Sequence, residues 1–141
     1  MDFDPDIEAS LSVIEIVSTL RAAKEPEELI LREVERCGYC EDATFAIKLA
    51  LEEAMTNAVK HGNRNDQAKR ITIRYSVSRE RTVILVRDQG PGFEPASVPD
   101  PTAPDRLPLP TGRGIMLMRA YMSEVHYRAG GAEVCLIKLN E

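Results

Sequence analysis

The sequence predicts an α/β protein of the α+β type, a two-layer sandwich in which three helices cover one face of a mixed, mostly antiparallel sheet. Two observations predict this fold. Segments with β-branched or continuously apolar residues alternate with helical patterns, in the order strand, two helices, two strands, helix, two strands. The last four strands form two pairs joined by short turns, which is typical of antiparallel hairpins. The length of 141 residues indicates a single domain, residues 1–141.

The first half of the chain contains the first strand and two helices. The segment SVIEIVST alternates loosely and is β-branched, so it predicts a strand. EPEELILREVERCG predicts a helix, with Pro26 near its start and Gly38 as its stop signal. The second helix is expected to begin near EDATFAIK and to run to about His61, with Gly62 as a left-handed cap.

The second half contains two hairpins separated by a long loop and a helix. RITIRYSVS and RTVILVRD form the first predicted hairpin. Glu94 to Thr111 holds six prolines and almost no periodicity, so we expect a loop there. GIMLMRAYMS predicts the third helix, and EVHYRAGGAEVCLIKLN predicts a closing hairpin that turns at Gly130 and Gly131.

Composition excludes several classes of function. The net charge of −5 and pI of about 5.2 argue against direct binding of nucleic acid, which normally needs a basic surface. No apolar run approaches the roughly 18 residues of a membrane span. The N-terminal segment MDFDPDIEAS is acidic and lacks the features of a signal peptide. We therefore expect a cytoplasmic protein that does not contact membranes.

Three cysteines are too few, and odd in number, for a disulfide framework. Cys37 and Cys40 form a C-x-x-C pair, which permits a metal half-site or a redox pair. The pair follows an expected helix end at Gly38, and the rest of the chain offers no second ligand pair. The sequence therefore favours reduced thiols in a helix–helix turn.

The second helix carries a polar stripe beside its apolar face. Glu53, Asn57 and His61 recur at four-residue intervals. Asn is a poor helix former, so its place in mid-helix usually has a reason. An imidazole at the helix end is also explained by the helix dipole. Taken alone, the stripe permits either a binding site or a solvated face. The core stripe of this helix is expected to contain Ile47, Leu51, Ala54 and Ala58.

A second motif follows the strand RTVILVR. Asp88 ends this apolar strand, where a carboxylate is costly unless it is hydrogen-bonded, and it can accept from an exocyclic amine such as that of adenine. Gly90 and Gly92 remove side chains where the backbone turns or approaches a ligand. The alternative is a simple Asp-Gly turn.

A third motif, PTGRGIMLM, precedes the third helix. Gly112 and Gly114 open onto a helix N-terminus, whose amides favour a phosphate, and Arg113 adds a positive charge. The alternative is a flexible loop that ends at a helix start. The spacing matches neither a Walker A loop nor a Rossmann fingerprint.

Taken in order, EEAMTNAVKHG, DQGPGF and TGRGIMLM resemble the N, G1 and G2 boxes of the Bergerat-type ATPases. This superfamily includes gyrase, heat-shock chaperones, mismatch-repair ATPases and histidine kinases. The chain most resembles the bacterial anti-sigma-factor serine/threonine kinases. The resemblance covers nearly the whole chain and implies the Bergerat ATP-binding fold, with ATP and Mg²⁺ as cofactors.

The resemblance also implies a role for each matching residue. Asn57 would coordinate the Mg²⁺ that bridges the ATP phosphates, and Glu53 would act as general base or position the nucleophile. Asp88 would receive the adenine amino group. The remaining candidates for the nucleotide site are His61, Gly90, Gly92, Gly112, Arg113 and Gly114, the last three at the end of a flexible ATP lid of about residues 94–113.

One departure concerns the closing hairpin. The family commonly has Gly-Thr there, with the hydroxyl near the adenine, whereas this chain has Ala132 after Gly131. Ala132 cannot make that hydrogen bond.

The resemblance leaves three functional classes open. The leading expectation is a kinase that phosphorylates a small anti-sigma-antagonist protein, acts as a homodimer and also binds a sigma factor. The second is a non-catalytic, nucleotide-gated module that sequesters a sigma factor or another regulator. The third, a histidine-kinase catalytic domain, is disfavoured because no segment of the sequence supplies a phosphoacceptor hairpin. Retention of Glu53 favours the kinase over the non-catalytic module.

Overall fold

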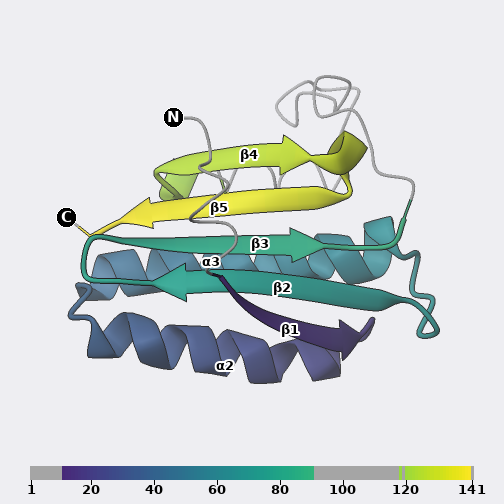
Figure 1. The fold of residues 1–141 in the computed structure, drawn as a ribbon, viewed down its shortest axis with the longest axis horizontal. Coiled ribbons are helices and arrows are strands. Elements are labelled where there is room, and N and C mark those ends of the chain that lie inside the picture. Colours follow the sequence, from purple (N-terminus) through teal and green to yellow (C-terminus); the bar gives the residue numbers. More distant parts are fainter. Residues whose placement is uncertain (1–10, 91–117, 119, 141) are drawn as a thin grey trace, which may run out of the picture.

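The fold is a five-stranded sheet with helices on one face (Figure 1). It comes from a computed structural model that describes residues 11–90, 118 and 120–140. The strand order is β1-β2-β3-β5-β4, and all four neighbouring pairs are antiparallel. The predicted α+β class is confirmed, but the expectation of a mixed sheet is wrong for the described strands. These strands are β1 (Ser12–Val17), β2 (Arg70–Val77), β3 (Arg81–Arg87), β4 (Glu124–Arg128) and β5 (Glu133–Leu139).

Two long helices, α2 (Leu20–Arg36) and α3 (Glu41–Thr56), pack side by side on this face (Figure 1). Half of the predicted third helix, residues 114–117 and 119, lies outside the described residues. Met118 is helical and buried, and Met122 just beyond it packs into the same core. Within the described ranges, no helix is long and apolar enough to cross a membrane.

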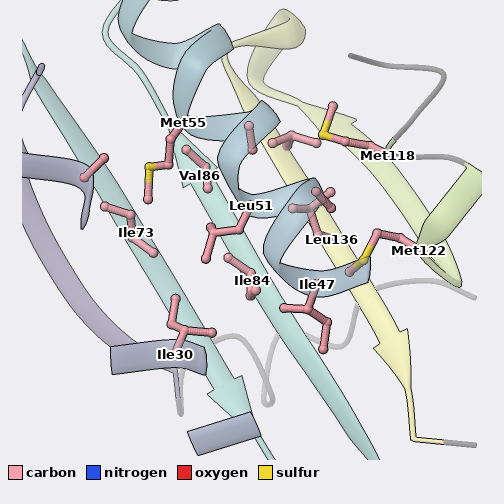
Figure 2. Packing of buried hydrophobic residues seen from close by; sticks show 14 of the residues in the cluster. Ile30, Ile47, Leu51, Met55, Ile73, Ile84, Val86, Met118, Met122 and Leu136 are labelled. Atoms are coloured by element: carbon pink, nitrogen blue, oxygen red, sulfur yellow. The ribbon is translucent and has the colours of Figure 1, made fainter. Parts of the chain in front are cut away.

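The main core lies between α3 and the sheet (Figure 2). Ile47 and Leu51 of α3 are completely buried, which confirms the predicted apolar stripe of this helix. Burial of each such side chain contributes about 1.5–3 kcal/mol of hydrophobic stabilisation. The core therefore holds α3, with its polar flank, firmly against the sheet. The strand residues facing this helix include Ile73, Ile84, Val86 and Leu136.

Helix α2 begins earlier than the sequence predicted. Thr19 is its N-cap, and the Thr19 Oγ1 accepts a hydrogen bond of 3.0 Å from the Ala22 amide. Pro26 lies inside the helix, where it is buried. The prediction that Pro26 marks the helix start is therefore wrong, because a threonine cap six residues before the predicted segment supplies the start signal.

The C-x-x-C pair connects the two helices. Cys37 is the C-cap of α2, and Gly38 follows with a positive φ of 82°. Cys40 is the N-cap of α3, and its Sγ accepts from the Ala43 amide at 3.4 Å. The prediction of thiols in a helix–helix turn is confirmed, since both cysteines are free and each ends or begins a helix.

A cleft of about 510 Å³ lies between the first part of α2 and the last part of α3. Glu27 and Lys24 line it from α2, and Glu52 and Lys48 line it from α3. Burial, followed by a hydrogen bond to Glu52, raises the pKa of Glu27 to about 7. The folded protein therefore keeps a proton on Glu27 that the unfolded chain releases at a lower pH.

This proton linkage makes stability depend on pH. Because the folded-state pKa of Glu27 is raised above 4.5, wild-type stability falls as pH rises from about 4.5 to about 7. Glu27→Gln imitates the protonated form and should stabilise the protein by about 1 kcal/mol at pH 8, a value reduced for solvent screening. At pH 4 the two proteins should be equally stable. Urea unfolding at both pH values measures the difference, and Glu28→Gln, in the same cleft, is the control. An equal gain at both pH values would contradict the linkage.

Candidate functional site

Helix α3 presents its two adjacent carboxylates on different flanks. Glu52 lines the cleft against α2, whereas Glu53 and Asn57 do not. Successive helical residues are about 100° apart, and residues four apart lie one above the other. Glu53 and Asn57, both half-buried, therefore share the flank that faces away from α2. Both residues carry side-chain oxygen atoms, which are the ligands that Mg²⁺ prefers.

Asn57 also begins a change of helix type. The segment Asn57–Gly62 is π-helical, and the Asn63 amide donates to the carbonyl of Ala58, five residues earlier, at 2.8 Å. The expected regular α-helix to His61 is therefore wrong in its last turn. Single π-helical turns occur frequently at functional sites because they change where the following side chains point. His61 is exposed in this turn, and its place in the nucleotide site stays a prediction.

Asp88 lies directly after β3 and is half-buried. Its amide donates to the Ala132 carbonyl at 2.9 Å, and its Oδ1 accepts from the Gly90 amide at 2.7 Å. Burial raises the pKa of Asp88, and the Gly90 amide opposes this shift. Within the described part of the chain, the Asp88 Oδ1 accepts the Gly90 hydrogen bond and Oδ2 accepts none.

The ends of the first two motifs meet at Asp88. A Cβ atom added to Gly62 would overlap the Asp88 carboxylate, and one added to Gly90 would overlap the Gly62 carbonyl. Gly62 does not have a positive φ. The expected left-handed cap is therefore wrong, and Gly62 is needed because the carboxylate lies against its backbone.

Ala132 lies next to this carboxylate through the backbone. Its carbonyl accepts from the Asp88 amide, and the residue is 8% exposed. Ala132 is therefore beside Asp88. The family that this chain resembles commonly has threonine at this position, whereas here the side chain is a buried methyl group.

The third motif and the loop before it lie in the part of the chain that the structure does not describe. Its residues Gly112, Arg113 and Gly114 lie outside the described residues, as do Gly92 and the expected lid of residues 94–113. Their roles stay predictions.

Sequence reasoning missed Asn63. It is completely buried, and its side chain is hydrogen-bonded to residues in three other parts of the chain. The local pattern HGN predicted only a helix end and a loop. No periodicity marks a single buried amide in a loop, so the sequence contained no signal for it.

Three of the predicted site residues lie in the described part of the chain and carry side-chain oxygen atoms: Glu53 in α3, Asn57 just after it, and Asp88 at the end of β3. No group of three or more His, Cys, Asp or Glu residues in the described part of the chain is arranged to hold a metal alone. Mg²⁺ usually takes one or two protein ligands and completes its shell with phosphate oxygens and water, and the side-chain oxygen of Asn57 is the predicted ligand.

Known proteins show similarity across most of the chain. A family model described as histidine kinase-like ATPase domain matches residues 17–138. The chain is 32% identical over 111 residues to the serine-protein kinase RsbW of Bacillus subtilis (strain 168), covering 73% of this chain and 69% of that protein. It is 34% identical over 113 residues to RsbW of Bacillus licheniformis, with the same coverage of both chains.

A solved structure shows the same fold. The crystal structure of the RsbU and RsbW domains of a Mycobacterium tuberculosis protein aligns with a TM-score of 0.60 and 18% identity. The alignment covers 92% of this chain and 33% of that chain.

Proposed function

Because the chain belongs to the histidine kinase-like ATPase family and is homologous to the RsbW serine-protein kinases, we propose that it is an ATP-dependent serine/threonine kinase and anti-sigma factor. Its substrate is a serine of a small anti-sigma-antagonist protein in a cytoplasmic, bacterial partner-switching pathway. The products are ADP and the phosphoserine protein. A sigma factor is the second proposed partner.

The proposed roles come from the family resemblance, and the positions of the side chains support them. Bound Mg·ATP supplies the phosphoryl group and neutralises part of its charge. Asn57 holds the metal, and Asp88 accepts from the adenine amino group through Oδ2. Glu53, one turn before Asn57, orients the serine hydroxyl and accepts its proton. A serine hydroxyl is a weak nucleophile at neutral pH, so it needs such an acceptor.

Glu53 is the observation that carries the kinase proposal. A module that only binds nucleotide needs Asn57 and Asp88, but it does not need a carboxylate one turn before the metal ligand. Glu53 is half-buried on the same flank of α3 as Asn57, whereas Glu52 lies against α2. This placement supports phosphoryl transfer in addition to binding.

The test begins with partners of the whole chain. Proteins that co-purify with it are identified by mass spectrometry, and each is incubated with the chain, Mg²⁺ and labelled ATP. We expect label on a serine of one small partner. If no partner is labelled, but one is retained only when nucleotide is present, the alternative of a nucleotide-gated binding module replaces the kinase.

Asp88→Asn tests base recognition. The exchange replaces a carboxylate acceptor with an amide, so we expect ATP affinity to fall about tenfold or more, while GTP affinity changes little. Calorimetry with both nucleotides measures the ratio. Asp66→Asn, in an exposed turn, is the control for the lost charge. If both affinities are unchanged, Asp88 does not recognise the base.

We also propose that the kinase is a homodimer that uses the edge strand β1. Among the described strands, β1 has one neighbour, β2, and Val13 on β1 is 61% exposed. Exposed apolar edge strands favour association. Light scattering should report a dimer for wild type and a monomer for Val13→Glu at micromolar concentration. Phe45→Glu, at a 59% exposed position on α3, is the control. A wild-type monomer at high micromolar concentration would contradict the dimer.

A further inference from the structure

Asn63 is the most completely bonded polar side chain near the candidate site. It is 0% exposed. Its Nδ2 donates to the Ser18 Oγ at 2.9 Å and to the Arg70 carbonyl at 3.1 Å. Its Oδ1 accepts from the Gln89 amide at 2.7 Å. Both donors and the acceptor of the amide are therefore used.

This bonding pattern specifies asparagine. A buried amide is costly unless its hydrogen bonds are made, and here each bond goes to a different segment. Ser18 follows β1, Arg70 begins β2, and Gln89 follows β3 by two residues. Aspartate would lose the two donors, and an apolar residue would leave all three partners without their bonds.

The bond to Gln89 acts next to Asp88. Gln89 is an exposed residue in a turn, yet its amide is held by the buried Asn63. A second bond, from the Arg70 amide to Gln89 Oε1 at 2.7 Å, fixes the same residue from β2. The peptide that follows Asp88 is therefore anchored although its surroundings are open to solvent.

Gly62, the neighbour of Asn63, contacts Asp88 directly. Its backbone lies against the Asp88 carboxylate, where no side chain would fit. The pair Gly62–Asn63 thus makes room for the carboxylate and fixes the peptide behind it. Oδ1 is occupied by the Gly90 amide, so the orientation of this unit determines where Oδ2 points.

We infer that Asn63 is a positioning residue that orients Asp88 for the adenine amino group and thereby sets the preference for ATP over GTP. The inference rests on the proposed nucleotide-binding function. A hydrogen bond discriminates between bases only if its acceptor is held in place before binding, because ordering a free loop would offset the gain. Asn63 provides this order through Gln89.

The matched control is Ser18. Ser18 is 1% exposed and bonds to Asn63 on the side away from Gln89. Ser18→Ala removes one buried hydrogen bond of the same cluster and leaves the Gln89 anchor. It therefore separates a loss of stability from a loss of positioning.

The experiment measures ATP and GTP affinity by calorimetry for wild type, Asn63→Ala, Ser18→Ala, Asp88→Asn and the Asn63→Ala/Asp88→Asn double variant. We expect Asn63→Ala to lower the ratio of ATP to GTP affinity about tenfold. Ser18→Ala should lower the melting temperature yet keep the ratio within about twofold of wild type. In the Asp88→Asn background, Asn63→Ala should not lower the ratio further, because the residue acts through Asp88.

An unchanged ratio in Asn63→Ala, or an equal loss with and without Asp88, would overturn the inference while wild-type ATP binding stands. If wild type itself does not prefer ATP over GTP, the result contradicts the proposed nucleotide-binding function and not the role of Asn63 within it.

Amide hydrogen exchange of nucleotide-free wild type tests the anchoring of Gln89 without any variant. The Gln89 amide should exchange much more slowly than that of an exposed residue such as Arg64, and equally fast exchange would overturn the inference.

Discussion

Glu53→Gln is expected to slow phosphoryl transfer by about two orders of magnitude or more while the fold and nucleotide affinity are kept. The substitution is nearly isosteric and removes both the negative charge of the carboxylate and its ability to accept a proton. Positioned proton transfer typically contributes about 10²–10⁴-fold in rate. Single-turnover transfer of labelled phosphate to the purified partner protein measures the effect, because it separates transfer from product release.

Glu52→Gln is the matched control for this experiment. It removes the same charge one residue earlier, on the flank that lines the cleft with α2. Its transfer rate should stay within about threefold of wild type, since Glu52 is placed away from Asn57. If Glu53→Gln transfers phosphate at the wild-type rate, Glu53 is a residue of the polar flank and another group accepts the proton.

Asn57→Ala is expected to weaken Mg·ATP binding by about 10- to 100-fold. The lost carboxamide contacts a charged group, and such interactions contribute about 1.5–3 kcal/mol. Alanine preserves the helix, because it has the highest helix propensity. Calorimetry with ATP in the presence and absence of Mg²⁺ tests the role directly.

The magnesium dependence supplies the control. Without Mg²⁺, wild type and Asn57→Ala should bind ATP with similar affinity. When Mg²⁺ is added, the ATP affinity of wild type should increase and that of Asn57→Ala should not. Undiminished Mg·ATP binding by the variant would remove Asn57 from the metal site. An equal loss with and without Mg²⁺ would show that Asn57 contacts the nucleotide instead.

Local signals predicted most of the fold. The hairpin of β2 and β3 and the turn at Gly130 and Gly131 are where alternation and turn residues placed them. The start of α2 was missed because Pro26 is a conspicuous signal, while the Thr19 cap has no acidic residue after it. The π-helical turn at Asn57 was also missed, since an apolar pattern of period 3.6 does not show where one turn widens.

In the candidate site, too, the sequence predicted the features that depend on neighbouring residues along the chain. The sequence by itself determined that Glu53 and Asn57 share one flank of a helix, because they are one helical turn apart, and the family resemblance supplied their proposed roles. It also placed Asp88 at the end of an apolar strand. These relations are local, so residue type and period are sufficient to find them.

Only the tertiary structure decided how these parts meet. Asp88 lies against the backbone of Gly62, 26 residues earlier, and the peptide behind it is held by Asn63. Both contacts depend on the register of β1, β2 and β3 and on the widened turn after α3. Close packing and the bonding of one buried amide are properties of atoms brought together from distant segments. No pattern along the chain encodes them, and only the assembled fold shows why Gly62 is glycine and Asn63 is asparagine.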